Sequence, residues 1–192
     1  MKLIFATNNA NKLSEVKQLL GNEFEIISLA DIGYTKDIPE PFDTLEENSL
    51  TKAKTIYDKF KVNCFAEDTG LEVEALNGEP GVLSARYAGI EKDANANMNK
   101  ILTNLSNKAN RNAQFRTVAT LILNGVEFQF EGIVKGEITK TKRGEDGFGY
   151  DPIFKAKDYD NTFAEMDKST KNNISHRGKA ISALVVFLRK QL

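Results

Sequence analysis

The sequence contains a single cysteine, Cys64, so no disulfide can form within the chain. Cys64 lies in the apolar run Val62–Ala66, where we expect a buried and unreactive thiol. The chain also lacks an apolar run of the ~20 residues that a membrane-spanning helix requires. Its first residues carry too few apolar side chains for a signal peptide. These absences predict a cytoplasmic protein with no membrane partner.

An excess of charge of either sign is missing as well. Lys and Arg number 26 and Asp and Glu number 27, which gives a net charge of −1 and a pI near 6.0. Proteins that bind nucleic-acid polymers usually carry a clear basic excess, so we expect no polymer partner, although a single nucleotide is compatible with this balance. The length of 192 residues suits one domain, residues 1–192, with or without two lobes.

Apolar periodicity predicts strands and helices mixed along the first half of the chain. We expect strands at Lys2–Thr7, Glu25–Leu29, Val62–Ala66 and Leu71–Leu76, the last two separated by a break at Glu67–Gly70. We expect helices at Asn11–Leu20, after a Thr44 capping box, after an Asp93 cap, and from about Ile174 to Lys190. Asn124-Gly125 joins two long strand-like runs, Ala113–Leu123 and Val126–Ile138, as a hairpin turn. The mixture predicts an α/β fold in which helices pack on a mixed sheet.

Polar residues at the first strand-to-helix junction have the chemistry of an anion site. The junction reads Thr7, Asn8, Asn9, Ala10, Asn11, Lys12. Free backbone N–H groups and the helix dipole face such a turn, and Lys12 adds a full positive charge. The alternative is an ordinary Asn-rich helix cap.

Carboxylates follow the predicted strand at Val62–Ala66. Asp68, preceded by Glu67 and followed by Thr69 and a glycine, suits a Mg²⁺ ligand or a general base. Glu40 stands between two prolines on a stiff extended loop and could share the metal. Glu47 fits its capping box better than a metal site. The alternatives are an acidic turn at Glu67-Asp68 and an exposed loop acid at Glu40.

Two later segments suggest recognition of a base. Phe148, Gly149, Tyr150 and Asp151 combine aromatic faces, which stack on bases, with a carboxylate that accepts from ring N–H groups. The alternative is a loop anchored in the core by its aromatic side chains. Further on, Lys171 precedes His176 and Arg177, and His176 is the only histidine. Donors from His176 and Arg177 would favour a purine with oxygen at C6 over one with an amino group. The alternative is a solvated helix start.

Six segments, in order, resemble the inosine/xanthosine triphosphate pyrophosphatase family, also called Ham1-like or RdgB-like. They are residues 7–12, Thr44–Ala53, Glu67–Val73, Pro80–Gly89, Phe148–Phe154 and Ser175–Ala180. The segment Pro80–Gly89 reads PGVLSARYAG, close to the family pattern PGxxSARYAG. Glu67 and Thr69 depart from the usual Asp and Ser but keep the charge and the hydroxyl.

The resemblance implies an enzyme that hydrolyses ITP, dITP and XTP to the monophosphate and pyrophosphate with Mg²⁺, usually as a homodimer. It implies Asp68 as general base and metal ligand, and Glu40 as second metal ligand. It implies that residues 7–12 and Lys171 hold the phosphates, that Thr69 contacts substrate, and that residues 148–151, His176 and Arg177 hold the base. The implied fold is an elongated mixed sheet with helices, in two lobes around a cleft.

Two other hypotheses remain open on the sequence. A nucleotide-binding sensor that does not hydrolyse would share the same motifs, and the Glu67 and Thr69 departures leave room for it. A Maf-type pyrophosphatase would keep the reaction and change the nucleotide, although the His176-Arg177 pair argues against it. Release of pyrophosphate from ITP separates the sensor from the enzymes.

Overall fold

The structure is a computed structural model and describes residues 1–21 and 23–191. The chain forms two compact units. Unit 1 consists of Met1–Asp68, Thr117–Gly132 and Arg177–Leu192, and unit 2 of Thr69–Arg116 and Ile133–His176. Because the chain passes between the units four times, three strands and one helix contribute residues to both: β3 (Cys64–Val73), β5 (Asn112–Leu123), β6 (Val126–Ile138) and α5 (His176–Arg189).

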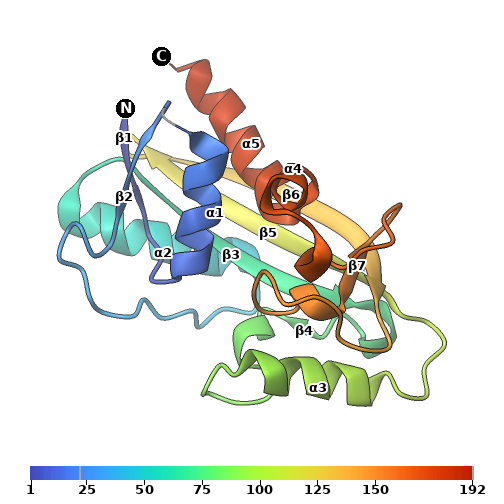
Figure 1. Cartoon of the computed structure of the whole chain (residues 1–192). Helices are drawn as coiled ribbons and strands as arrows, with labels where there is room; N and C mark the ends of the chain where they lie inside the picture. The colour runs from blue at the N-terminus through green and yellow to red at the C-terminus, as the bar shows by residue number, and fades with distance from the viewer. Residues whose placement is uncertain (22, 192) are drawn as a thin grey trace. The chain divides into compact units, whose positions relative to one another are not determined.

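The strands form a mixed sheet, as predicted (Figure 1). The strand order is β2-β1-β3-β5-β6-β7, and β4 pairs with β3. The remaining strands are β1 (Lys2–Phe5), β2 (Glu25–Ser28), β4 (Pro80–Gly81) and β7 (Phe154–Ala156). Strand β1 runs parallel to β2 and β3, whereas β4 and β7 run antiparallel to their neighbours. The α/β fold class is therefore confirmed, and the cleft that the resemblance implies stays a prediction.

In unit 1, successive residues of β1 face two different apolar clusters, as the period of a strand requires. Leu3 and Phe5 pack with α1 (Ala10–Leu20) and α5, while Ile4 and Ala6 pack with α2 (Leu45–Phe60). Helices therefore cover both faces of this part of the sheet.

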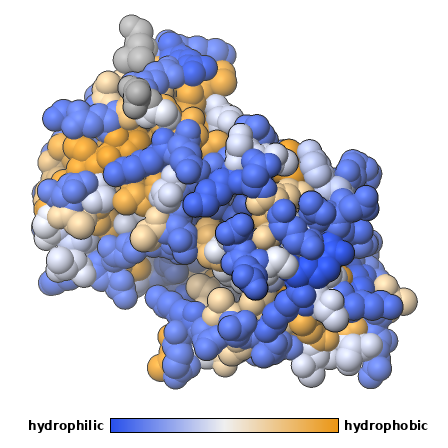
Figure 2. Space-filling model, viewed as in Figure 1, coloured by the Kyte–Doolittle hydropathy of each residue, from blue (hydrophilic) through white to orange (hydrophobic). Residues whose placement is uncertain are grey.

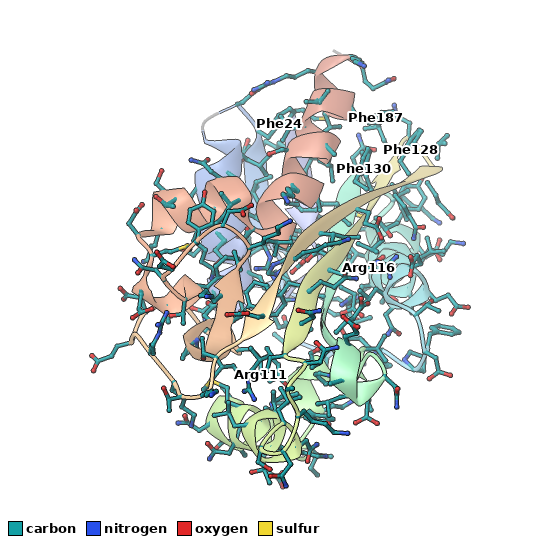
Figure 3. All side chains as sticks on the ribbon, turned by 90° about the vertical axis from the view of Figure 1, so that its right-hand side faces the viewer. Phe24, Arg111, Arg116, Phe128, Phe130 and Phe187 are labelled. Carbon is teal, nitrogen blue, oxygen red and sulfur yellow. The ribbon has the colours of Figure 1, made fainter. Side chains whose placement is uncertain are left out.

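Three phenylalanines attach α5 to strand β6 in the same unit. The ring centroids of Phe128 and Phe130 lie 4.4 and 5.4 Å from that of Phe187, and Figure 3 shows the three side chains grouped together. All three are only partly buried. The cluster therefore extends the unit 1 core toward solvent along α5.

Unit 2 has its own core, built around phenylalanines. The Phe154 ring centroid lies 4.7 Å from that of Phe115 and 5.1 Å from that of Phe163. Leu71 and Val73 of β3, and Met98 and Ile101 of α3 (Ala94–Asn104), complete this cluster. The second helix of the unit is α4 (Lys168–Ile174).

Local sequence signals end and begin the elements where expected. Thr44 accepts a hydrogen bond from Glu47 N–H at 3.2 Å, and Asp93 accepts one from Ala96 N–H at 2.8 Å. Asn124 and Gly125 have φ values of 53° and 84°, the left-handed pair that a type I′ hairpin turn needs. These predictions are confirmed. They could be made from the sequence because each depends on a few neighbouring residues.

The predicted break at Glu67–Gly70 is wrong, because β3 runs without interruption from Cys64 to Val73. The acidic pair stays in the strand because both side chains are buried against cations, as described below. Gly70 suits the strand because a Cβ there would lie 2.8 Å from the Gly81 carbonyl oxygen of β4. The strand predicted to reach Leu76 ends at Val73 and is followed by a 3₁₀ turn, Glu74–Leu76. Helix α4 and the short strands β4 and β7 were not predicted.

No helix in residues 1–21 and 23–191 is long and apolar enough to cross a membrane. Hydrophilic residues cover most of the face drawn in Figure 2, with apolar patches among them. The described large apolar side chains that are exposed include Leu83, Ile90 and Val126.

Candidate active site

In unit 1, the turn between β1 and α1 is an Asn-capped helix start. The Asn9 side chain accepts hydrogen bonds from the N–H groups of Asn11 (2.9 Å) and Lys12 (3.1 Å), and Asn9 N–H donates to Thr7 Oγ1 at 3.1 Å. Residues 8–11 are exposed, so the positive end of the helix dipole faces solvent. The Asn-rich cap and the predicted anion site are thus the same residues. An incoming anion must bind beside the Asn9 oxygen or replace it.

Behind this turn, the buried Arg177 guanidinium is held by two carboxylates. Arg177 Nε and Nη2 donate to Glu67 Oε1 at 3.2 and 3.1 Å, and Nη1 donates to Glu15 of α1. Lys12 Nζ lies 2.9 Å from the same Glu67 oxygen. Burial alone would lower the pKa of Arg177, but the charges of Glu67 and Glu15 outweigh it and raise that pKa. Two cations and two carboxylates therefore form one buried network.

This network changes how the predicted roles of Arg177 and Glu67 are understood. All three guanidinium nitrogens of Arg177 donate to carboxylates within unit 1. The residue thus acts as an internal counter-ion, and its contact with a base stays a prediction. Glu67, which departs from the usual Asp of the family, has a fully buried side chain between Arg177 and Lys12.

The two predicted metal ligands, Glu40 and Asp68, both accept a hydrogen bond from the ammonium group of Lys52. Lys52 Nζ donates to Glu40 Oε1 and, at 3.1 Å, to Asp68 Oδ1. Asp68 and Lys52 are buried, and Glu40 is partly exposed. The structure therefore brings together the carboxylates that the sequence singled out, and it adds a lysine that the sequence analysis had not assigned.

The second Asp68 oxygen, Oδ2, is buried and has no hydrogen-bond partner among the residues that the structure describes. Burial raises the pKa of Asp68 above its ordinary value, against the opposing charges of Lys52 and Lys12. A carboxylate with a raised pKa is a stronger base, which is the property that a general base needs. Within the described ranges, no group of three or more His, Cys, Asp or Glu side chains is placed to hold a metal ion. Two carboxylates is the number that Mg²⁺ commonly takes from a protein when phosphates and water complete its shell.

In unit 2, the loop Gly147–Asp151 is organised by the Asp151 carboxylate. Asp151 Oδ2 accepts hydrogen bonds from Phe148 N–H at 2.8 Å and from Lys171 Nζ at 2.6 Å, and both charged residues are buried. The Lys171 ammonium also lies 5.0 Å from the Phe148 ring centroid. Lys171, predicted to hold phosphate, is thus placed with the predicted base-binding loop, and its phosphate contact stays a prediction.

The two aromatic residues of this loop differ in exposure. Tyr150 is buried and its hydroxyl donates to the Ser84 carbonyl oxygen at 2.7 Å, whereas Phe148 and Gly149 are partly exposed. Burial raises the pKa of Tyr150 above its ordinary value. Tyr150 therefore anchors the loop in the core, which is the alternative considered on the sequence. Phe148 is left as the aromatic face that a base could reach.

His176 is also buried, against the aromatic core of unit 2. Its ring stacks on that of Phe115 with a centroid distance of 4.5 Å and an interplanar angle of 18°. Only 3% of the residue is exposed. The solvated helix start considered on the sequence is therefore wrong, because the stack removes the ring from water.

A hydrogen bond joins the residues after Asp68 to the Pro80–Gly89 segment. The sequence did not reveal this role of the segment. Thr69 is partly exposed, and two residues further on Leu71 N–H donates to Ser84 Oγ at 2.8 Å. Ser84 Oγ donates in turn to the Gly81 carbonyl at 2.6 Å. Ser84 therefore links strand β3 to the loop that contains Tyr150.

Sequence reasoning missed Lys52, Glu15 and Ser84 as parts of this arrangement. Lys52 had a detectable signal, since it occupies a core position of α2 between Asn48 and Ile56 in the helical period. A lysine on the apolar face of a helix is unusual unless it is paired. Glu15 and Ser84 carry no comparable local signal. The contacts that give them their roles, with Arg177 for Glu15 and with Leu71 and Tyr150 for Ser84, join residues well separated in the sequence.

The fold is that of one known group of α/β proteins. The model of the Ham1 family matches residues 3–187, and the chain belongs to that family.

Individual relatives match nearly the whole chain. A dITP/XTP pyrophosphatase of Flavobacterium johnsoniae is 55% identical, and the match covers 98% of both chains. A dITP/XTP pyrophosphatase of Porphyromonas gingivalis is 50% identical over 97% of each. Among solved structures, the Ham1 protein of Staphylococcus aureus superposes with a TM-score of 0.90 at 39% identity and covers 100% of both chains.

Proposed function

We propose that the protein is a Mg²⁺-dependent pyrophosphatase that hydrolyses dITP, ITP and XTP to the nucleoside monophosphate and pyrophosphate, and so removes non-canonical purine nucleotides from the cytoplasmic pool. The observation that carries the proposal is the cluster of the buried Lys52 and Asp68 with the partly exposed Glu40, in which Asp68 Oδ2 has no hydrogen-bond partner among the described residues. The name dITP/XTP pyrophosphatase, borne by relatives 40 to 55% identical, supports the substrate class.

The residues of unit 1 fit a divalent cation. Glu40 and Asp68 offer carboxylate oxygens, the ligands that Mg²⁺ prefers, and Asp68 Oδ2, which no described residue hydrogen-bonds, is an available ligand atom. A bound Mg²⁺ would supply positive charge against the phosphate oxygens and acidify a bound water.

The chemistry that we assign to unit 1 is hydrolysis at the α-phosphorus. A water oxygen forms a bond to this phosphorus while the bond to the bridging oxygen of the pyrophosphate breaks. Asp68 accepts the proton that the water loses, and the electron pair of the broken bond leaves with pyrophosphate. Lys12 and the N-terminal turn of α1 offset the negative charge of the phosphates. Phosphoryl transfer of this kind depends mainly on positioning and charge stabilisation.

We assign recognition of the base to unit 2. Phe148 is partly exposed and offers an aromatic face for stacking. Asp151 accepts from ring N–H groups, while Tyr150 and Lys171 hold this loop in shape. His176 of this unit remains a proposed donor to the oxygen at C6, as does Arg177, which belongs to unit 1, and Thr69 remains a proposed substrate contact.

A nucleotide panel scored for pyrophosphate tests the proposal. We expect release from dITP, ITP and XTP only with Mg²⁺, and far slower release from dATP and dGTP. Binding of dITP without release would indicate the sensor instead, and preference for another nucleotide would indicate a Maf-type specificity.

Asp68→Asn tests the catalytic assignment. We expect kcat for dITP to fall by about 10²–10⁴-fold, because the amide cannot accept the proton of the water. The far-ultraviolet circular dichroism spectrum should match that of wild type. Near-normal turnover by a folded variant would remove Asp68 from the role of general base.

We also propose that the enzyme works as a homodimer. Light scattering coupled to size exclusion measures this directly, with an expected mass of twice the 21.4 kDa of the chain.

A further inference from the structure

In unit 1, the positively charged side chain of Lys52 contacts two carboxylates at once. Its ammonium donates to Glu40 Oε1 and to Asp68 Oδ1, and nine-tenths of the Lys52 side chain is buried. The charge of a second lysine, Lys12, also acts on Asp68, but Lys12 forms its ion pair with Glu67. Lys52 is thus the cation that bridges the two acids.

Two carboxylates with little access to water repel each other, and burial disfavours the charge of each. An ammonium group placed between them offsets both effects without any ligand. A divalent cation seeks oxygens of the same two carboxylates, including Asp68 Oδ2, which no described residue hydrogen-bonds. The ammonium and the metal ion repel each other because both carry positive charge. An ammonium bound to the two carboxylates therefore weakens the binding of a metal ion there.

We propose that Lys52 is a built-in substitute for the metal: its ammonium binds the carboxylates of Glu40 and Asp68 in the free protein, keeps metal affinity low, and gives up these contacts when the metal arrives with nucleotide phosphates. The inference rests on the proposed metal site at Glu40 and Asp68. The anionic phosphate oxygens favour this exchange because they bring the negative charge that the added metal requires. Lys52 is accordingly a positioning residue, one that acts through the two acids.

Metal binding without nucleotide tests the inference. We would titrate the nucleotide-free protein with Mn²⁺ and measure free Mn²⁺ by electron paramagnetic resonance, for wild type and Lys52→Gln. The glutamine keeps a chain of similar length and removes the charge, so we expect Mn²⁺ to bind at least about tenfold more tightly.

Two matched substitutions separate direct competition from a general charge effect. Lys12→Gln removes a nearby charge that is not bonded to Glu40 or Asp68, and we expect a clearly smaller gain in affinity than for Lys52→Gln. Lys54→Gln lies on the same helix but pairs with Glu127 at the surface, and we expect no change. Equal gains in Lys12→Gln and Lys52→Gln, or no gain in Lys52→Gln, would overturn the proposal.

If Lys52→Gln does not fold, the wild-type protein supplies the test. With lysine labelled at Cε and Nζ, the Lys52 signal, assigned from Lys52→Arg, should shift as Mg²⁺ is raised to several times its Kd. A signal that stays unchanged at saturation would overturn the proposal.

These measurements are independent of turnover. Pyrophosphate release from dITP with Mg²⁺ tests the proposed function, whereas metal binding without nucleotide tests Lys52. Normal hydrolysis combined with unchanged metal affinity in Lys52→Gln would reject the proposal that Lys52 substitutes for the metal. The proposed enzymatic function would stand.

Discussion

Glu67 lies between two cations of unit 1, and its carboxylate is completely buried. Arg177 donates to it twice, and Lys12 lies 2.9 Å away. Removing one partner of a buried ion pair leaves an uncompensated charge, which typically costs about 3–5 kcal/mol. The stability of unit 1 therefore depends on a residue that also sets the position of Lys12.

We expect Glu67→Gln to lower the free energy of unfolding by about 3 kcal/mol, because the buried Arg177 loses the negative charge to which its Nε and Nη2 donate. Urea denaturation measures this directly. The matched control is Glu145→Gln at an exposed loop position, where a change within about 0.5 kcal/mol is expected. Equal midpoints for the two variants would contradict the buried network.

Cys64 should be unreactive in the folded protein. Burial raises the pKa of its thiol to about 12, and its Sγ lies 3.3 Å from the Ala53 carbonyl oxygen. At pH 8 the thiolate is therefore roughly a thousandfold scarcer than for a free cysteine, and the thiolate fraction grows only as pH rises toward 12. We expect mass spectrometry to show alkylation by iodoacetamide at least about a thousandfold slower in native protein than in urea. Comparable rates would show that Cys64 is accessible.

At the scale of elements, the loop Gly147–Asp151 depends on a glycine that no other residue can replace without strain. Gly147 has a φ of 77°, and a Cβ there would overlap Asp151 Oδ2. The same carboxylate oxygen binds Phe148 N–H and Lys171. A side chain at residue 147 would therefore displace the group that organises the proposed base-binding loop.

We expect Gly147→Ala to raise KM for dITP by about tenfold or more through loss of this loop geometry. Gly33→Ala is the control, since Gly33 has a similar φ of 66° but a Cβ added there would meet no described atom within 4 Å. It should cost only the ~1–2 kcal/mol of a left-handed backbone and leave KM unchanged. Equal KM values in the two variants would mean that the Asp151 contact does not matter for substrate.

The continuity of strand β3 was not predicted because it does not follow from the local sequence. Glu67, Asp68 and Gly70 together are typical of a turn, and local propensity alone ends the strand there. In the fold, Arg177 and Lys52 neutralise the two acids, and the Gly81 backbone of β4 occupies the space beside Gly70. None of these partners is near in the sequence, so the strand depends on tertiary contacts.

At the scale of the whole molecule, the nearly balanced charge predicts that nucleic-acid polymers are not ligands. With a net charge of −1, the protein has no basic excess to release counterions from DNA. We expect no change in fluorescence anisotropy of labelled duplex DNA at about 150 mM salt, while dITP binds under the same conditions. Salt-dependent DNA binding would contradict this prediction.

The sequence by itself determined the α/β class, most of the strands and helices, and the family. Helix caps at Thr44 and Asp93 and the Asn124-Gly125 turn depend on neighbouring residues, and apolar periodicity depends on a single element. Only the tertiary structure decided which charges meet. Lys52 between Glu40 and Asp68, and Arg177 between Glu15 and Glu67, join elements far apart in the chain. Burial makes such pairing energetically necessary, but a sequence does not state which cation will meet which acid.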